Sequence, residues 1–526
     1  MPILLHHLLT QRAKLSPHDN AIGYKDTWWT YQELETQCES IRQSFNSLGV
    51  QLGQRIAVYL PKTLEAVASY FSISMSGGAI VPVNPILKSR QVSHILRDCS
   101  ASILITNSVR FDSFSPEELK GLEHVILIDG DSKKLPDLTI WSWEDFCALS
   151  SDNDTNELFI IESDIAAIFY TSGSTGNPKG VVLNHKNLVL GADSVSSYLP
   201  CLASDKMLAV LPFSFDYGFS QLTIAFSVGA SCYLVEYVFT QSLFKVILQQ
   251  KITTLALVPP LWIKLADEEW PDNAGHQIRY FCNTGGSMPT TTLEALRKQM
   301  PNAKPYLMYG LTEAFRSCYL PPEEIDNRPT SFGRAIPNAK IMVVNESGQE
   351  CEAHEHGELV HCGPLVSQGY WNDPVKTQQR FKQRPDQIPQ LTLPETAVWS
   401  GDIVKKDEEG YFYFVGRKDD MLKTSGYRVS PQEIEDTLYC ISCVKEAVIV
   451  GIPHPILGQA ILAIVIAEQD SAAQQEVLKA CRELLPSYMI PTKVILTEAL
   501  PRNTNGKFDR SSLRDKYYNI FMAQDK

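Results

Sequence analysis

The sequence has little that would suit a nucleic-acid partner or a membrane. Its 526 residues carry 47 Lys and Arg against 60 Asp and Glu, a net charge of −13. An acidic chain lacks the positive field that attracts nucleic acid. No apolar run reaches the roughly 20 residues that a membrane helix needs. We therefore expect no nucleic-acid partner and no membrane span, so any phosphate chemistry must rely on a few local cations.

A secretion signal and a disulfide framework are missing as well. The opening stretch MPILLHHLLTQRAKLSP has no basic segment ahead of its apolar one, and two histidines interrupt the apolar run. Its leucines recur at helical spacing instead, which predicts an amphipathic first helix. The 12 cysteines are scattered without framework spacing. This pattern is typical of reduced thiols in a cytoplasmic protein.

Short β-branched runs alternate with helical patterns along most of the chain. The strand-like run 55–61 precedes a helical stretch and a second strand-like run at 79–85, and 206–213 begins the same sequence of elements. This alternation predicts the α/β class, with parallel sheets covered by helices. The chain is also too long for one ordinary domain.

The pattern changes near residues 415–420. Beyond them come two strand-like runs and a helical stretch, about the length of a small α+β domain. We predict an N-terminal domain over residues 1–416 and a C-terminal domain over 417–526, with a charged, glycine-bearing hinge between them.

The stretch YTSGSTGNPKG at 170–180 has the chemistry of an anion-binding loop. Its glycines allow successive backbone N–H groups to face one concavity, and Lys179 supplies a positive charge. The spacing is not that of a Walker A loop, because Lys179 lies between Pro178 and Gly180. A solvated Gly/Ser turn is the alternative. The residues predicted to hold phosphate are Thr171, Ser172, Gly173, Ser174, Thr175 and Lys179.

Together with four further motifs, this loop resembles the adenylate-forming superfamily. That group includes acyl-CoA synthetases, luciferases and the amino-acid adenylation domains of nonribosomal peptide synthetases. The matching motifs follow in the family's order: YGLTEA (309–314), SGD (400–402), GRKDDMLKTSGYRVSPQEIE (416–435) and PRNTNGKFDR (501–510). The resemblance implies a large N-terminal domain of α/β subdomains and a small, mobile α+β C-terminal domain.

The resemblance also implies a two-step reaction. A carboxylate and Mg-ATP would first give an acyl-adenylate and pyrophosphate, and a thiol would then displace AMP. Lys507 would bridge the carboxylate and the α-phosphate, although taken alone it could be a surface lysine after an Asn-Gly turn. Glu313 would bind Mg²⁺, since hard oxygen ligands suit that ion. Thr312 would contact the phosphates. Ser400 stands where the family usually has Thr and keeps its hydroxyl.

The remaining roles follow residue by residue from the same motifs. Tyr309 would stack on the adenine, Asp402 would contact the ribose, and Arg417 would contact the ribose or a phosphate. Gly285 and Gly286 would let the backbone approach the base, with Ser287, Met308 and Gly310 beside them. Asp419 matches the hinge position, and Lys423 and Gly426 lie in the loop that approaches the thiol in the second step.

The stretch 351–363 could be mistaken for a zinc site. It holds Cys351, His354, His356, His361 and Cys362, which are all possible zinc ligands. However, GELVHCG alternates like a strand, which would place His361 and Cys362 on opposite faces. The family has a strand here without a metal. We therefore expect no zinc.

Asp216, in LPFSFDYGFSQ, bears on the choice of substrate. In amino-acid adenylation domains the matching position is often Asp, which binds the substrate's α-ammonium. A buried carboxylate is costly without a cationic partner, and an ammonium would supply one. Alternatively, Asp216 caps the following helix. Other positions matching the family's acid pocket are Tyr217, Ser220, Leu257, Asn283, Gly285, Met308, Arg316 and Ser317.

Tyr217 replaces a commonly small residue and would shorten the acid pocket, which favours a compact amino acid such as proline. Arg316 suits a small apolar acid poorly unless its side chain is turned aside. Its charge is also compatible with an acidic or hydroxylated substrate. An acyl-CoA ligase for a non-amino acid stays open, as does a non-catalytic nucleotide-binding regulator. The sequence shows no carrier-protein segment, so we expect a separate carrier protein or CoA as the thiol acceptor.

Overall fold

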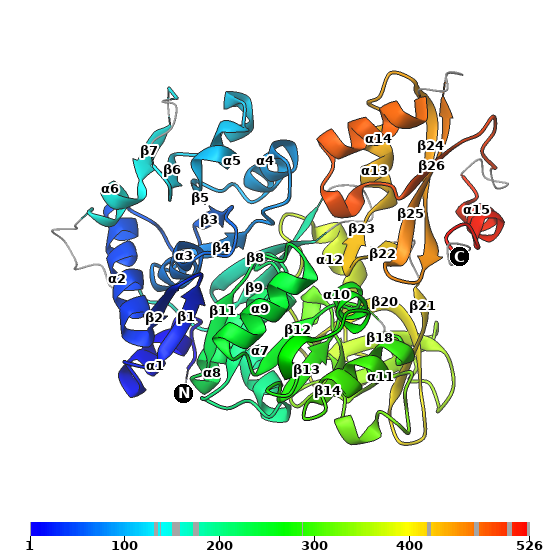
Figure 1. The fold of residues 1–526 in the computed structure, drawn as a ribbon, viewed down its shortest axis with the longest axis horizontal. Coiled ribbons are helices and arrows are strands. Elements are labelled where there is room, and N and C mark those ends of the chain that lie inside the picture. Colours follow the sequence, from blue (N-terminus) through cyan, green and yellow to red (C-terminus); the bar gives the residue numbers. More distant parts are fainter. Residues whose placement is uncertain are drawn as a thin grey trace.

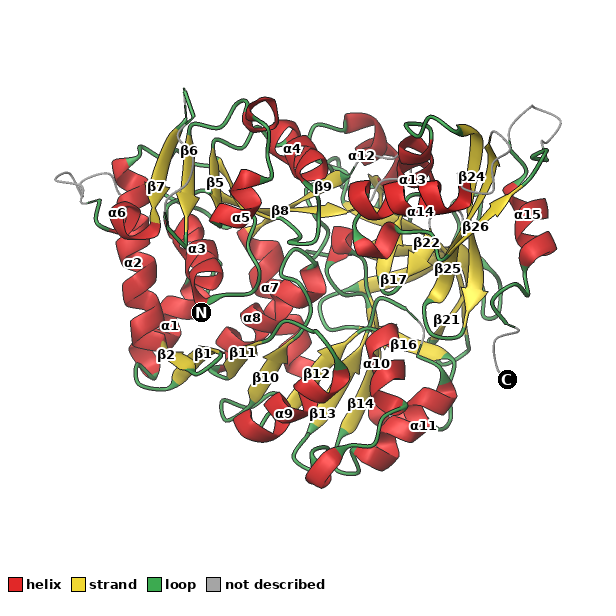
Figure 2. Ribbon diagram, turned by 45° about the horizontal axis from the view of Figure 1, so that its top comes forward, coloured by secondary structure: helices red, strands yellow, loops and turns green. Residues whose placement is uncertain are grey.

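Three β-sheets and their flanking helices make up the computed structural model (Figures 1 and 2). The structure describes residues 2–130, 135–136, 138–149, 158–171, 178–286, 288–417, 422–467, 473–501 and 508–522. Within those ranges, no helix has both the length and the apolar character needed to cross a membrane.

The first sheet has seven strands in the order β7-β6-β5-β3-β4-β8-β9. Its neighbours are parallel except for the antiparallel pair β8 and β9, as the alternation of strand-like and helical runs predicts. The strands are β3 (Arg55–Val58), β4 (Ala79–Pro82), β5 (Ile103–Thr106), β6 (His124–Leu127), β7 (Thr139–Ser142), β8 (Ile165–Thr171) and β9 (Lys179–Asn184).

The second sheet has 14 strands and runs from β17 to β2 in the order β17-β18-β20-β21-β16-β15-β14-β13-β12-β10-β11-β1-β2, with β19 beside β20. Its parallel part extends from β14 to β1. The strands are β1 (Asn20–Tyr24), β2 (Thr27–Thr30), β10 (Lys206–Ala209), β11 (Ser231–Leu234), β12 (Thr254–Leu257), β13 (Tyr280–Asn283), β14 (Lys304–Tyr309), β15 (Cys318–Leu320), β16 (Ser331–Ala335), β17 (Lys340–Val344), β18 (Gly357–Cys362), β19 (Phe381–Gln383), β20 (Thr396–Lys406) and β21 (Phe412–Arg417).

Helices cover both sheets. Several begin at side chains that favour helix starts: the Thr63 hydroxyl, for example, accepts a hydrogen bond from the Ala66 N–H at the start of α3. The helices are α1 (His7–Leu15), α2 (Tyr31–Ser47), α3 (Leu64–Met75), α4 (Ser89–Asp98), α5 (Ser108–Asp112), α6 (Trp143–Cys147), α7 (His185–Tyr198), α8 (Asp216–Val228), α9 (Thr240–Gln250), α10 (Pro259–Ala266), α11 (Thr290–Gln299) and α12 (Pro374–Arg380), with 3-10 turns η1 (Pro116–Leu119), η2 (Pro271–Asn273), η3 (Thr312–Ala314) and η4 (Pro322–Glu324).

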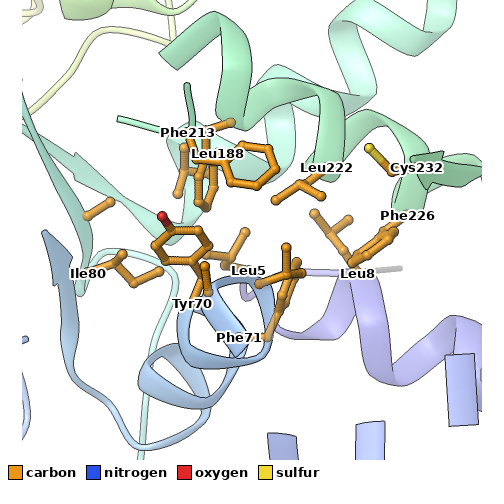
Figure 3. Packing of buried hydrophobic residues seen from close by; sticks show 14 of the residues in the cluster. Leu5, Leu8, Tyr70, Phe71, Ile80, Leu188, Phe213, Leu222, Phe226 and Cys232 are labelled. Atoms are coloured by element: carbon orange, nitrogen blue, oxygen red, sulfur yellow. The ribbon is translucent and has the colours of Figure 1, made fainter. Parts of the chain in front are cut away.

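The largest core joins the N-terminal segment to α3, α7 and α8 (Figure 3). Leu5 and Leu8 pack there with Tyr70, Phe71 and Phe226. The predicted amphipathic first helix is therefore confirmed, and its apolar face closes the layer of helices shared by the two sheets. Burial of such side chains contributes roughly 1.5–3 kcal/mol each.

A smaller unit with its own sheet follows residue 421, in the upper right of Figure 1. Its core is separate from the others. The sheet order is β23-β22-β25-β24, with β26 beside β25, and the two strand-like runs predicted here are β24 and β25. The elements are β22 (Leu422–Thr424), β23 (Tyr427–Val429), α13 (Pro431–Leu438), β24 (Val444–His454), β25 (Gly458–Ala467), α14 (Ala473–Leu484), η5 (Ser487–Met489), β26 (Lys493–Leu496) and α15 (Arg510–Tyr517).

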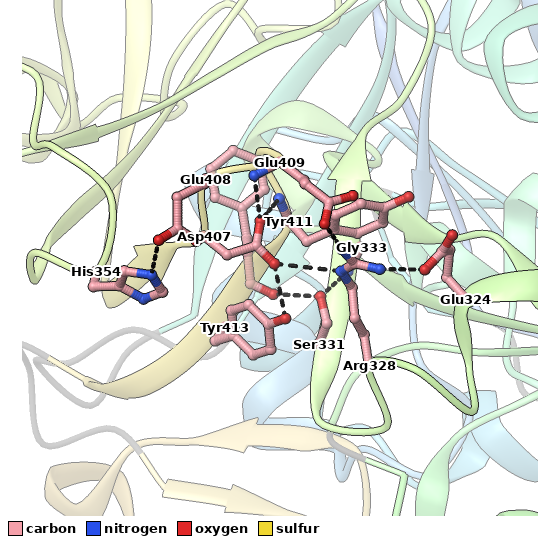
Figure 4. Close-up of polar contacts among 11 residues, drawn as sticks. Glu324, Arg328, Ser331, Gly333, His354, Asp407, Glu408, Glu409, Tyr411 and Tyr413 are labelled. Atoms are coloured by element: carbon pink, nitrogen blue, oxygen red, sulfur yellow. Dashed lines mark hydrogen bonds and ion pairs between the residues drawn. The ribbon is translucent and has the colours of Figure 1, made fainter.

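The boundary between 416 and 417 stays a prediction. Arg417 is the last residue of β21 in the large sheet, and the hinge residue Asp419 lies outside the described ranges. Near the start of β21, Arg328 fixes the turn that connects β20 to β21 (Figure 4). It pairs with Asp407 at 3.3 Å, with Glu409 at 2.5 Å and also with Glu324. This network holds together two strands, β20 and β21, that carry predicted nucleotide-binding residues.

Candidate active site

A cleft of about 590 Å³ lies where the two large sheets meet the small unit. Side chains reach it from the ends of β8 and β14, from the start of α8 and from the hairpin β22–β23. Loops at the carboxyl ends of parallel strands are the usual place for ligands in such sheets. The predicted site residues that line the cleft are Thr171, Asp216, Gly285, Gly310, Thr312, Glu313, Arg316, Asp402, Lys423 and Gly426.

Lys179 and Glu313 meet at one end of this cleft. The Lys179 Nζ lies 3.2 Å from Glu313 Oε1, and both side chains are less than a tenth exposed. The Tyr370 hydroxyl lies between them: it accepts from Lys179 Nζ at 2.5 Å and donates to Glu313 Oε1 at 2.6 Å. The sequence analysis missed Tyr370, because nothing in GYWND relates it to a lysine 191 residues earlier.

Part of the predicted phosphate loop falls outside the described residues. Ser172, Gly173, Ser174 and Thr175 lie there, as do Ser287 and Lys507. The described flank still fits a nucleotide. The Thr171 Oγ1 is buried and has no hydrogen-bond partner among the residues that the structure describes. A phosphate oxygen is one acceptor that would satisfy it.

At the other end, Tyr309 and Asp402 are in direct contact. The Tyr309 hydroxyl donates to Asp402 Oδ2 at 2.5 Å, and Asp402 lies opposite Arg417 in the pairing of β20 with β21. The Ser400 hydroxyl accepts from the Asp402 N–H at 3.1 Å and donates to the Leu359 carbonyl. The hydroxyl kept at position 400 thus orients the predicted ribose-binding carboxylate.

Two glycines that line the cleft, Gly285 and Gly310, occupy positions where a side chain is disfavoured. Gly285 has φ +81°, which side-chain-bearing residues rarely adopt. A Cβ added at Gly310 would lie only 2.7 Å from the Phe315 carbonyl oxygen. A side chain at Gly285 would therefore be strained, and one at Gly310 would collide with the protein's own backbone.

Asp216 lines the cleft and contacts two other side chains of the protein. Its Oδ1 accepts from the Thr312 hydroxyl at 3.3 Å, and its Oδ2 lies 3.7 Å from Nη1 of Arg316. Arg316 is 2% exposed, lies over the Tyr217 ring and donates to Ser220 Oγ at 3.3 Å. Burial raises the pKa of Asp216 and the Arg316 guanidinium opposes that rise. Asp216 is the first residue of α8, and no side chain, including that of Asp216, caps the start of this helix.

Behind Tyr217 lies a second cavity of about 30 Å³, lined by Ser220, Met308 and Arg316 among others. The Tyr217 hydroxyl donates to the Cys282 carbonyl at 3.1 Å, which fixes the ring in the lining of this smaller cavity. The shortening of the acid pocket by Tyr217 stays a prediction.

Three predicted pocket residues line neither cavity. Leu257 belongs to a hydrophobic core, and the Asn283 amide donates to the Gly286 carbonyl at 3.0 Å. The Ser317 hydroxyl shares a hydrogen bond with His361 Nδ1 at 2.9 Å. These positions support the pocket from behind and do not face its interior.

The stretch with the five possible zinc ligands includes strand β18. His361 and Cys362 end strand β18 and are both buried, Cys362 in a small apolar cluster. Across the described ranges, no group of three or more His, Cys, Asp and Glu side chains could hold a metal ion. No disulfide joins any of the 12 cysteines, all of which lie in the described part of the chain.

The hairpin turn at residues 425–426 reaches the cleft from the small unit. Gly426 has φ +82°, and a Cβ there would lie 3.1 Å from Val258 side-chain atoms. An ideal Cβ at Gly285 would lie 3.8 Å from the Gly426 carbonyl oxygen. Next to the turn, Tyr427 stacks on Tyr488 with ring centroids 4.0 Å apart. In this orientation the β22–β23 hairpin therefore lies over Gly285, which is predicted to contact the adenine base.

A buried carboxylate, Glu433, lies at the contact between the small unit and α4. Glu433 Oε1, on α13, accepts from Gln91 Nε2 of α4 at 3.2 Å. Burial raises the pKa of Glu433 from 4.5 to about 7, the Asp436 charge adds to the rise and Gln91 opposes it. Tyr488 also faces this carboxylate.

We expect docking of the small unit to weaken as the pH rises from about 4.5 through about 7, because the docked state binds the Glu433 proton more tightly. Glu433→Gln should remove this dependence, since the amide stays neutral. Energy transfer between dyes placed on the two units would measure docking. Glu483→Gln, on the exposed side of α14, is the control. The same pH dependence in Glu433→Gln would contradict the assignment.

Family models match most of the chain. The model for AMP-binding enzymes covers residues 9–371, and the model for their C-terminal domain covers 433–507. The chain is 28% identical to the L-proline–[L-prolyl-carrier protein] ligase of Pseudomonas fluorescens, over 97% of this chain and 98% of that one. It is 26% identical to the long-chain-fatty-acid–CoA ligase of Bacillus subtilis, over 97% and 94%.

One solved relative occurs in two states. The o-succinylbenzoate CoA synthetase of Bacillus subtilis is 25% identical, and each comparison covers 97% of this chain and 98% of that one. A double mutant with a product analogue has a TM-score of 0.83, and the complex with the acyl-adenylate intermediate has a TM-score of 0.69.

Proposed function

Since the chain belongs to the AMP-binding enzyme family and is an adenylate-forming acid–thiol ligase, we propose that it activates a small amino acid. L-Proline is the best candidate. The aminoacyl-adenylate would pass to the phosphopantetheine thiol of a separate carrier protein in natural-product biosynthesis. The observation that carries the amino-acid proposal is Asp216, a buried carboxylate in the wall of the cleft whose pKa is raised by burial.

In the first half-reaction, the amino acid's carboxylate attacks the α-phosphorus of ATP and pyrophosphate leaves. Repulsion between the two anions must be overcome by positioned positive charge. Lys179 and the Thr171 hydroxyl face the β- and γ-phosphates, and Lys507 bridges the reacting groups. Glu313 would hold Mg²⁺, which when bound neutralises charge on the phosphates. Asp402 and Tyr309 hold the nucleoside.

In the second half-reaction, the thiol attacks the adenylate and AMP leaves. The orientation described here suits this step, because the turn at Gly426 lies against Val258 and beside Gly285. The higher TM-score to the relative with a product analogue supports the same assignment. The small unit would rotate to bring Lys507 in for the first step and the hairpin in for the second.

Binding of an amino acid requires a change in the partners of Asp216. Its contact with Arg316 is long, at 3.7 Å, whereas Arg316 keeps closer bonds to Ser220 and to the Phe315 carbonyl. A substrate ammonium can therefore replace the Arg316 contact without leaving the guanidinium unbonded. If instead Asp216 only neutralises Arg316, the enzyme is an acyl-CoA ligase for a non-amino acid, and this is the second candidate.

ATP–pyrophosphate exchange across the proteinogenic amino acids and a panel of fatty, aryl and short-chain acids tests the proposal. Exchange driven by proline or another compact amino acid is the expected result. Exchange driven by acids without an amino group would move the protein to the second candidate. Product formation with CoA and with a loaded carrier protein would then identify the acceptor.

A further inference from the structure

Tyr370 is held in place by the strand that carries Lys179. Residues 368–371 pair with β9: the Val182 N–H donates to the Gly369 carbonyl at 3.0 Å, and the Trp371 N–H donates to the Gly180 carbonyl at 2.7 Å. The Tyr370 side chain therefore projects from a backbone whose position relative to Lys179 is fixed on both sides.

The same segment is also bonded to the turn that carries Glu313. The Ser367 N–H donates to the Glu313 carbonyl at 2.9 Å. Tyr370 is 6% exposed, and its ring packs edge-on against Phe381 at a centroid distance of 5.4 Å. One short segment thus joins the backbone of the predicted phosphate lysine to the backbone of the predicted metal ligand.

We propose that Tyr370 is a positioning residue for the divalent cation that accompanies ATP, acting through Glu313; this rests on the function proposed above. Its hydroxyl donates to Glu313 Oε1 at 2.6 Å and so fixes the direction in which the carboxylate faces the cleft. Carboxylates that bind metals are commonly oriented by such hydrogen bonds, whose loss weakens metal binding about 10- to 100-fold.

The geometry also explains how Lys179 can leave Glu313 when the nucleotide binds. The Lys179 ammonium lies 3.8 Å from the Tyr370 ring centroid as well as 2.5 Å from its hydroxyl oxygen. Tyr370 can stay bonded to Glu313 while Lys179 turns to a phosphate oxygen. The carboxylate then keeps one hydrogen bond and exchanges its lysine for the metal.

Tyr370→Phe tests the proposal, because it removes the hydroxyl and keeps the ring that packs on Phe381. Mn²⁺ would be titrated by electron paramagnetic resonance into enzyme saturated with α,β-methylene ATP, which cannot form an adenylate. We expect Mn²⁺ affinity to fall roughly 10- to 100-fold, with nucleotide affinity in the absence of divalent ions unchanged.

The matched control is Tyr233→Phe, which removes a hydroxyl that donates to the Lys25 carbonyl at 2.7 Å, outside the cleft. Glu313→Gln should weaken Mn²⁺ binding as well, and the double variant with Tyr370→Phe should lose little more than Glu313→Gln alone. Wild-type Mn²⁺ affinity in Tyr370→Phe, with a lowered melting temperature, would make Tyr370 purely structural. The titration needs no acid substrate, so its result is independent of whether an amino acid is activated.

Discussion

Asp216→Ala is expected to raise the KM for the amino acid roughly 100-fold or more, with little change in the KM for ATP. Removing one partner of a buried, hydrogen-bonded charge pair costs about 2–5 kcal/mol, largely because the other charge is left unpaired. In this case the unpaired charge would be the substrate's ammonium, in the wall of the cleft. Amino-acid-dependent ATP–pyrophosphate exchange measures both constants.

The controls must separate the ammonium from Arg316, which also loses its partner in Asp216→Ala. Asp216→Asn keeps the side chain's size and removes its charge, and a thermal melt checks that each variant is folded. Arg316→Met should keep amino-acid binding if Asp216 recognises the ammonium. Recovery of activity in the Asp216→Ala, Arg316→Met double variant would show instead that the two charges only neutralise each other.

Lys507→Ala is expected to lower ATP–pyrophosphate exchange roughly 100- to 1,000-fold, the usual effect of removing one positioned electrostatic group from a transition state. ATP binding should persist, because Lys179, Tyr309 and Asp402 are untouched. Thioester formation from a supplied aminoacyl-adenylate should also persist. The turn at Gly426 lies beside Gly285, and in the proposed mechanism the second step relies on this turn and not on Lys507.

Lys516→Ala, on α15 of the same small unit, is the matched control for loss of a lysine. Nucleotide binding by calorimetry and thioester formation by mass spectrometry complete the comparison. An exchange rate near that of the wild type would remove Lys507 from the first half-reaction. Equal losses in both half-reactions would instead indicate that the variant damages the small unit as a whole.

The sequence predicted most of the fold because the fold depends on local patterns. Parallel strands buried on both faces are continuous apolar runs, so 55–61 and 79–85 could be recognised without knowledge of their neighbours. The first helix was predicted from leucine spacing alone. The assignment of β3 to the centre of one sheet and of β10 to another could not be predicted, since sheet order depends on contacts between distant segments.

The site shows the same division. The glycines and hydroxyls of the phosphate loop follow from the chemistry that an anion needs, and that chemistry is visible in the residues themselves. The role of the acid at 313 was implied by the resemblance of YGLTEA to a family motif. Tyr370 was missed because its role depends on Lys179 and Glu313, which are remote in sequence. The partner of Asp216 was also missed: the costly buried carboxylate was recognised, but Arg316 was assigned separately to the substrate.

The sequence by itself determined the class of chemistry in two steps. The residue types of the phosphate loop predicted an anion site, and the resemblance of five ordered motifs to the adenylate-forming superfamily implied the reaction. The tertiary structure decided how polar side chains pair: Lys179 with Glu313 and Arg316 with Asp216 as ion pairs, and Tyr309 with Asp402 through a hydrogen bond. It also decided which face of the small unit meets the cleft. These side-chain pairings join segments 93 to 134 residues apart, and the domain contact between Gln91 and Glu433 joins segments 342 residues apart, which no local pattern specifies.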